Sequence, residues 1–223
     1  MLDFAQARRM MVDCQLRTFD VNDLPLLVVM DDVPRERFVP EDHAAFAYID
    51  RDIPVSDGLE APERRFMLAP MVLARLIQAL DVKKGDKVLD VAGGLGYASA
   101  VMARLGASVI ALEASEALAK AARERLGQCG VETVRTVAGP LDKGFAEAAP
   151  YDAILVNGAV EIKPQGLLEQ LGQGGRLACV EGTGRAAKAR LYVRSGDAFG
   201  ARSLFDAAAP PLMAFRAEPG FVF

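Results

Sequence analysis

The sequence predicts an α/β protein with a doubly wound, mostly parallel sheet, a helical N-terminal cap and an antiparallel C-terminal edge. Between residues 87 and 181, short apolar runs rich in β-branched residues alternate with helix-forming segments, the pattern of a parallel sheet covered by helices. The first run leads into glycines at positions 93, 94 and 96, and the second run ends in Glu113. Parallel sheets of this kind bind ligands at the carboxyl ends of their strands, so we expect the functional site there.

The composition narrows the class of protein. Hydrophobic residues make up 52% of the 223 residues and charged residues 25%, the balance of a globular chain. The net charge of −4 argues against a nucleic-acid partner bound mainly through phosphates. No apolar run approaches the roughly 18 residues that span a bilayer, so we expect no membrane partner. The amino-terminal segment lacks the apolar core of a signal peptide, which predicts a cytoplasmic location.

Metal and triad chemistry have little support in the sequence. Cys14, Cys129 and Cys179 lie far apart without a CxxC pair, so we expect them to be reduced core residues. His43 is the only histidine, and no usual ligand or triad spacing surrounds it. We therefore expect no metal site.

Residues 1–78 precede the strand–helix alternation and are predicted to form a cap or lid integrated with the core. Residues 3–17 have helical spacing, and Asn22 or Asp23 is a candidate N-cap for a second helix that continues to Met30.

The rest of the cap is predicted to be less regular. Prolines at both ends of Val33-Pro-Arg-Glu-Arg-Phe-Val-Pro40 favour an extended, irregular path. Residues 50–66 are charged and contain proline and glycine, which predicts a mobile loop. Pro70 then opens a helix that leads to the first strand.

Residues 79–183 are predicted to be the ligand-binding core. We expect its strands at 87–92, 108–113, 133–138, 152–157 and 175–181, and its helices at 97–105, 115–128, 142–148 and 164–171. Residues 184–223 are predicted to add antiparallel strands on either side of the hairpin turn Ser195-Gly196-Asp197. The tail from Ala207 to Phe223 is apolar, and we expect it to dock on the domain.

The acidic and glycine residues at the strand ends indicate the ligand. An acidic residue at the tip of the second strand, Glu113, is placed to accept hydrogen bonds from ribose hydroxyls. The first strand ends in Asp90 and does not run directly into Gly-x-Gly, which favours S-adenosylmethionine over a dinucleotide. The alternative is a nucleotide-free α/β domain with an ordinary glycine turn.

The motifs, in their order along the chain, resemble those of the protein-L-isoaspartate O-methyltransferases, which use S-adenosylmethionine to methylate abnormal isoaspartyl carboxylates. The matching pieces run from residue 8 to about residue 182, and the segment from Val33 to Pro40 is the most specific. The other matching pieces are Gln15-Leu16, Ala47-Tyr-Ile-Asp50, the helix after Pro70, the glycine turn, Pro150-Tyr-Asp-Ala-Ile154, and Pro164, Leu168, Gln170-Leu171 and Gly174-Gly-Arg-Leu177. The resemblance implies a Rossmann-like methyltransferase fold.

By the same resemblance, candidate cofactor-binding residues can be named. They are Asp90, Ala92, Gly93, Gly94, Gly96, Tyr97, Glu113, Ala114, Gly139, Pro140 and Asn157. Two of them depart from the family pattern. Ala92 replaces the first glycine of the turn, and Pro140 replaces the aspartate that contacts the adenine amino group. Asp142 is either a substitute contact for adenine or the cap of a helix, and Asn157 lies either at the rim of the site or in an ordinary turn.

The predicted acceptor side departs further from the family. Leu68 stands at the position of the family's catalytic serine, two residues before Pro70. The loop before it carries Glu63-Arg64-Arg65 in place of a Gly-Gln-Thr run. Arg64 and Arg65 are either a replacement clamp for a carboxylate or solvated loop residues.

Three functions are consistent with these residues. The first is a methyltransferase of the isoaspartyl type with reduced activity, which binds S-adenosylmethionine, S-adenosylhomocysteine and a peptide or protein acceptor. The second is a methyltransferase with a different acceptor. The third is a non-catalytic relative that binds the cofactor or a partner. The sequence leaves the oligomeric state open.

Overall fold

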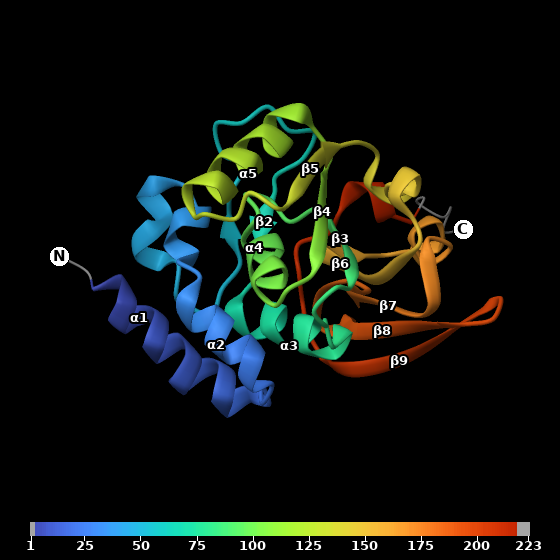
Figure 1. Ribbon diagram of the computed structural model, residues 1–223, viewed down its shortest axis with the longest axis horizontal. Helices are drawn as coiled ribbons and strands as arrows, with labels where there is room; N and C mark the ends of the chain where they lie inside the picture. Colours follow the sequence, from blue (N-terminus) through green and yellow to red (C-terminus); the bar gives the residue numbers. More distant parts are fainter. Residues whose placement is uncertain (1–2, 218–223) are drawn as a thin grey trace, which may run out of the picture.

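The computed structural model describes residues 3–217, and a seven-stranded sheet runs through its centre (Figure 1). The strand order is β5-β4-β3-β6-β7-β8-β9. The strands are β3 (Lys87–Val91), β4 (Ser108–Glu113), β5 (Arg135–Ala138), β6 (Tyr151–Val160), β7 (Leu171–Glu181), β8 (Lys188–Ser195) and β9 (Ala198–Asp206). Strands β3 to β7 are parallel, and β8 and β9 add an antiparallel edge, so the predicted fold class is confirmed.

Two apolar cores cover the two faces of this sheet. Neighbouring residues of a strand point to opposite faces, and accordingly Val88 packs in one core and Leu89 in the other. The helices of the first face are α1 (Phe4–Met11), α2 (Leu24–Asp32), α3 (Pro70–Leu80), α4 (Tyr97–Arg104) and α5 (Glu116–Gln128). Figure 1 shows α1, α2, α4 and α5 to the left of the parallel strands. The second core contains Leu167 of the short helix α6 (Gln165–Leu168) and Phe215 of the C-terminal segment.

The N-terminal third packs into the same core as the sheet. Met11 of α1, Leu26 of α2 and Leu73 of α3 all belong to the core cluster that contains Val88. Of the two candidate caps of α2, Asp23 is the one used, because its Oδ1 accepts the Leu26 N–H at 3.1 Å. The segment boundaries at residues 78 and 183 stay predictions.

Several predicted elements differ from the structure. The helix expected at 142–148 is replaced by two 3-10 turns, Leu141–Lys143 and Ala146–Ala148, because Gly144 between them has φ +63° and interrupts helical geometry. The segment at 33–40, expected to be extended, contains a 3-10 turn at Arg35–Phe38. The expected helix at 164–171 is only the single turn α6, because β7 already begins at Leu171.

The predicted loop at 50–66 is more ordered than expected. Its ends pair as a two-stranded antiparallel ladder, β1 (Ile53–Pro54) with β2 (Phe66–Met67). Val55, Ser56 and Arg65 are buried, so this loop is anchored against the rest of the protein at both ends.

The C-terminal segment docks as predicted over the residues that the structure describes. Pro211 pairs with Ala159 near the end of β6, and Leu212 and Phe215 are buried. The remainder of the predicted docking tail, 218–223, lies outside the described residues.

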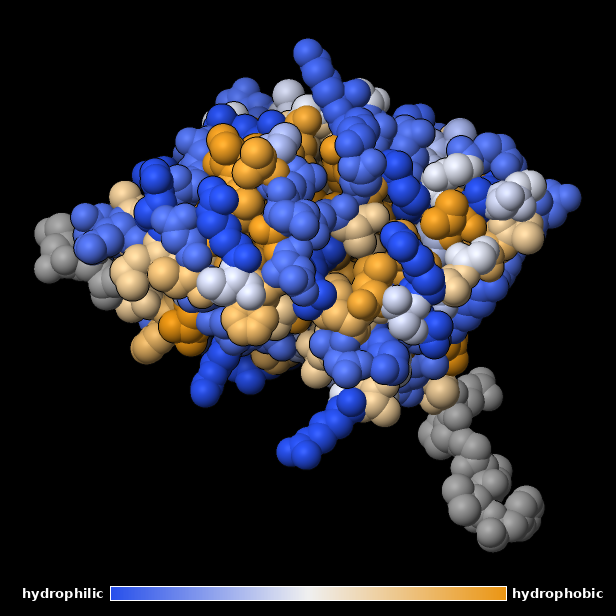
Figure 2. Space-filling model, turned by 90° about the horizontal axis from the view of Figure 1, so that it is seen from below, coloured by the Kyte–Doolittle hydropathy of each residue, from blue (hydrophilic) through white to orange (hydrophobic). Residues whose placement is uncertain are grey.

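The surface is mixed in character. On the face that is seen from below relative to Figure 1, apolar side chains lie in separate small groups among hydrophilic ones (Figure 2).

Cys14 is exposed. The prediction that all three cysteines are core residues is therefore wrong for Cys14, which lies on the outer side of the N-terminal helical segment. Within residues 3–217, no helix has the length and apolar character needed to cross a membrane.

Candidate cofactor site at the strand ends

The glycine turn after β3 has an unusual backbone. Ala92, Gly94 and Gly96 all have positive φ angles, of 62°, 65° and 96°. Glycine adopts this region freely, whereas alanine is strained there by roughly 1–2 kcal/mol. Gly93 is required for a different reason: a Cβ added there would lie 2.6 Å from Oδ2 of Asp90. The turn therefore folds tightly over the carboxylate of Asp90.

Asp90 is fully buried and ties three elements together. Its Oδ2 accepts a hydrogen bond from the Ser99 hydroxyl of α4, and its Oδ1 accepts one from Nδ2 of Asn157 in β6. Burial raises the pKa of Asp90 to about 6, although the two hydrogen bonds oppose the shift. Asp90 thus holds the glycine turn in place from beneath.

Asn157 is part of this support and is not in a turn. Strand β6 continues through it to Val160, because Ala159 pairs with Val180 of β7 on one side and with Pro211 of the C-terminal segment on the other. The Asn157 amide also donates to the carbonyl of Val91 at 3.1 Å. Asn157, which was expected at the rim of the site, is therefore buried and connects β3 to β6 through these two hydrogen bonds.

Glu113 ends β4 with a carboxylate that is only 2% exposed. Its Oε1 accepts the Gly94 N–H at 2.5 Å, and its Oε2 accepts the Ala114 N–H at 3.2 Å. Burial raises the pKa of Glu113, while the positive charge of Arg65 opposes this shift. The predicted glycine turn and the predicted acidic residue therefore meet directly.

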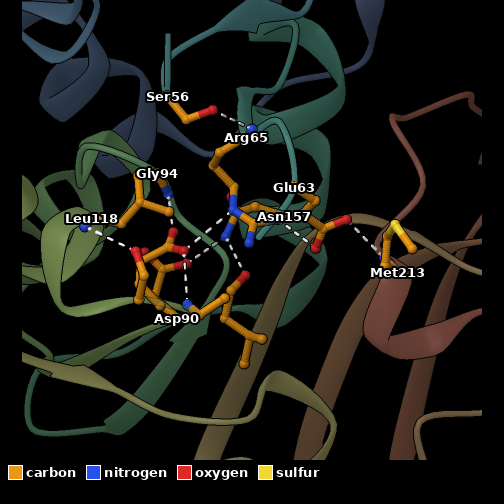
Figure 3. Close-up of polar contacts among 12 residues, drawn as sticks. Ser56, Glu63, Arg65, Asp90, Gly94, Leu118, Asn157 and Met213 are labelled. Carbon is orange, nitrogen blue, oxygen red and sulfur yellow. Dashed lines mark hydrogen bonds and ion pairs between the residues drawn. The ribbon is translucent and has the colours of Figure 1, made fainter. Parts of the chain in front are cut away.

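Arg65 and Arg64 lie in different environments. The Arg65 side chain, 1% exposed, places its Nε 3.2 Å from Oε2 of Glu113. Figure 3 shows it reaching from the loop between Gly94 and Asn157. Arg64 instead points to the surface and makes two hydrogen bonds to Asp57, at 3.0 and 2.8 Å. The structure therefore does not bring the two arginines together as a clamp, nor does it leave both in solvent.

Two cavities flank the segment 60–65, which we call the strap. One, of about 500 Å³, is lined by Ala114, Gly139, Pro140 and Asp142. The other, of about 530 Å³, lies between Glu60 and the start of α5. Both volumes fall within the 300–1,000 Å³ typical of small-molecule sites.

Asp142 lines the first of these cavities. Its side chain caps no helix, because the turn that contains it has no side-chain cap. Of its two predicted roles, the helix cap is therefore wrong, and the contact to adenine stays a prediction.

Leu68 lies between β2 and α3 with its side chain in the core, 1% exposed. Its carbonyl oxygen accepts a hydrogen bond of 2.6 Å from Nη2 of the buried Arg35. The next residue, Ala69, donates its N–H to Asp52 at 2.8 Å. The backbone at Leu68, the predicted serine position, is therefore firmly held, although the leucine side chain offers no hydrogen bond.

Comparison with known families agrees with this geometry. The model of the protein-L-isoaspartate(D-aspartate) O-methyltransferase family matches residues 8–203. The chain belongs to this family. A protein-L-isoaspartate O-methyltransferase of Methylorubrum populi is 40% identical over 214 residues, which cover 96% of this chain and 97% of that one. The enzyme of the same name from Roseiflexus sp. RS-1 is 36% identical over 213 residues, covering 95% and 94%.

Solved structures give the same fold. A protein-L-isoaspartate O-methyltransferase structure superposes with a TM-score of 0.79 at 25% identity, covering 92% of this chain and 65%, a little under two thirds, of that one. A Plasmodium falciparum protein assigned the same activity, solved in complex with S-adenosyl-L-homocysteine, has a TM-score of 0.73 at 22% identity, covering 93% and 98%.

Relative to this protein-L-isoaspartate O-methyltransferase pattern, the site contains residues that the sequence analysis did not single out. Ser99 holds Asp90, Ser56 accepts the Arg65 N–H at 2.8 Å, and Arg35 holds the carbonyl of Leu68. Arg35 lies in the most specific motif, which could have marked it. No sequence pattern marks Ser56 or Ser99, although each has its partner only nine positions away.

Proposed function

We propose that this protein transfers a methyl group from S-adenosylmethionine to a protein carboxylate of the isoaspartyl type, with lower turnover than relatives that keep the catalytic serine. The observation that carries the proposal is the buried carboxylate of Glu113 at the end of β4, hydrogen-bonded to the Gly94 amide of the glycine turn. An acidic residue in this place is suited to accept the hydroxyls of a ribose.

The residues present fit the cofactor. Glu113 offers carboxylate oxygens for the ribose, and Gly94 lacks the Cβ that would obstruct close approach to the turn. The cavity lined by Ala114, Gly139 and Pro140 is a site for the adenine ring, with mainly apolar walls. When bound, S-adenosylmethionine supplies a methyl group on a positively charged sulfur.

The protein has little proton chemistry to perform. A carboxylic acid has a pKa near 4, so an isoaspartyl acceptor is already ionised at neutral pH and needs no general base. The work left to the protein is to align the acceptor oxygen with the methyl group and to exclude water, which in favourable cases is worth about 7–11 kcal/mol.

Leu68 is the reason for expecting low turnover. A hydrogen bond to a charged group contributes about 1.5–3 kcal/mol, and the leucine side chain cannot donate one. Its apolar surface also disfavours a desolvated carboxylate nearby. The same observation supports a second candidate function, in which the scaffold methylates a less polar acceptor.

The test is methylation of an isoaspartyl peptide at saturating cofactor by the Leu68→Ser and Leu68→Ala variants. Both remove buried leucine atoms and should lower the free energy of unfolding by about 2–5 kcal/mol, so each serves as the other's control for stability. We expect serine to raise kcat about 10-fold or more over alanine, since only serine restores the donor.

Equal turnover by the two variants would indicate a rebuilt acceptor site and favour the second candidate. Robust methylation by the unaltered protein would show that position 68 is dispensable and would contradict the proposed reduction.

A further inference from the structure

Arg65 occupies the place at which the proposed ribose contact would form. Its Nε faces Oε2 of Glu113 at 3.2 Å, and its Nη1 lies 3.4 Å from Oε1 of Glu63. Its Nη2 is buried without a hydrogen-bond partner. A buried guanidinium normally has all its donors paired, so this side chain is only partly satisfied where it lies.

The same segment also covers the glycine turn. A Cβ added at Gly94 would lie 2.7 Å from Cγ2 of Val55 and 3.4 Å from Cγ of Arg65. The open side of Gly94, through which a ligand would approach the backbone, therefore faces the protein's own side chains.

The strap is fastened to the rest of the molecule on both sides of the site. The carbonyl of Glu60 accepts a hydrogen bond from the Ser115 hydroxyl at 2.8 Å, beside the end of β4. Oε2 of Glu63 accepts the N–H of Met213 at 2.8 Å, in the C-terminal segment (Figure 3). Between these fastenings the strap separates the two cavities, and Pro62 and Ala114 line both of them.

We propose that Arg65 is a built-in competitor of the cofactor, which holds Glu113 in a closed state and has to leave it before a ribose can bind. The inference rests on the proposed function, because it takes Glu113 as the ribose contact. The inference follows from two observations. The Glu113 carboxylate is buried, and the positively charged Arg65 side chain lies against its Oε2, where a ribose hydroxyl would have to bind. Cofactor affinity and association rate are then set partly by the opening of the strap.

The test is the affinity for S-adenosylhomocysteine, by calorimetry, and its association rate, by stopped flow, in Arg65→Gln and Arg64→Gln. The two changes remove the same charge from adjacent residues, but only Arg65 contacts Glu113. We expect Arg65→Gln to lower the Kd about 10-fold or more, the range of one hydrogen bond to a charge, and to raise the association rate. Arg64→Gln should stay within about twofold of the parent.

A second variant guards against misfolding of Arg65→Gln, which thermal unfolding would reveal. Glu63→Gln weakens both the hydrogen bond from Met213 and the ion pair of Glu63 with Arg65, while the contact of Arg65 with Glu113 remains. It should therefore raise the association rate by a smaller factor. If Arg65→Gln does not fold, a parental association rate in Glu63→Gln overturns the proposal.

The outcomes separate this inference from the function on which it rests. Binding with the same Kd and rate in the parent, Arg65→Gln and Arg64→Gln would overturn the competitor role and leave the proposed function intact. Binding of S-adenosylhomocysteine by Arg65→Gln, but not by the parent or Arg64→Gln, would support both the competitor role and the proposed function. Binding by none of the folded variants would overturn both.

Discussion

At the scale of single residues, Ala92 has a backbone conformation that its side chain disfavours. The alanine adopts left-handed geometry, with φ +62°, and is fully buried. Replacing a buried alanine by glycine normally costs about 1 kcal/mol or more, through backbone entropy and a lost methyl group. At Ala92 the relief of strain should offset that cost.

We therefore predict that Ala92→Gly lowers the free energy of unfolding by about 1–2 kcal/mol less than Ala111→Gly does. Ala111 is a matched control, because it is buried in the neighbouring strand β4 without a positive φ. Chemical denaturation of both variants measures the difference. Equal losses would mean that position 92 is unstrained.

Pro140 is the second position at which we predict a departure from the family pattern. It lines the cavity proposed for adenine but offers neither a side-chain acceptor nor a backbone N–H. Pro140→Asp should therefore bind S-adenosylhomocysteine more tightly than Pro140→Ala, which restores only the N–H, by about 1.5 kcal/mol or more. Weaker binding by the aspartate variant would indicate that Asp142 already contacts the base.

For single residues, the sequence predicted which residues form the site, but it did not predict which of them contact one another. Glu113 and the glycine turn follow from strand ends that a local pattern reveals. The ion pair of Arg65 with Glu113 joins residues 48 positions apart, and no local pattern specifies such a partner. This is why two adjacent arginines with the same chemistry have different environments.

At the scale of secondary structure elements, β3, α4 and β6 are joined beneath the site by one buried carboxylate. Asp90 connects them through Ser99 and Asn157. Burial holds its pKa at about 6, above the ordinary value, so the folded protein keeps a proton on Asp90 at a pH where the unfolded chain has lost it. The contribution of Asp90 to stability therefore falls as the pH rises from about 4 to about 6.

We predict that the unfolding free energy of the parent, relative to Asp90→Asn, decreases by about 2 kcal/mol between about pH 4 and pH 7. Denaturant unfolding at a series of pH values provides the comparison, and the asparagine variant removes the titration while keeping the shape. A difference that is independent of pH would show that Asp90 titrates as an exposed carboxylate does.

Predictions of elements were accurate where the pattern was long and failed where tertiary contacts decide. The five parallel strands and the C-terminal hairpin are regular in sequence and in structure. The extension of β6 past Asn157 depends on the pairing of Ala159 with Val180 of β7 and with Pro211, which lie more than twenty and more than fifty residues away. The absence of the helix expected at 142–148 could have been predicted locally, because Gly144 lies near the middle of that segment and interrupts helical geometry.

At the scale of the whole molecule, both ends of the chain contribute to one site. The N-terminal third supplies the strap, the C-terminal segment supplies Met213, and the sheet supplies the glycine turn and Glu113. Membership of the protein-L-isoaspartate O-methyltransferase family accounts for the sheet and for the cofactor side. Leu68 and Arg65, the predicted departures from the family pattern, both lie where the cap meets the sheet, so we expect the cap to determine this member's specificity.

The central claim is that a nucleoside cofactor binds at Glu113, and calorimetric titration with S-adenosylhomocysteine tests it most directly. We predict one site per chain, in the parent or in the strap-opened Arg65→Gln variant, and binding at least about 10-fold weaker when Glu113→Gln is added to whichever of these binds. Thermal unfolding confirms that each titrated variant is folded. No binding by either folded protein, or an affinity unchanged by Glu113→Gln, would contradict the claim.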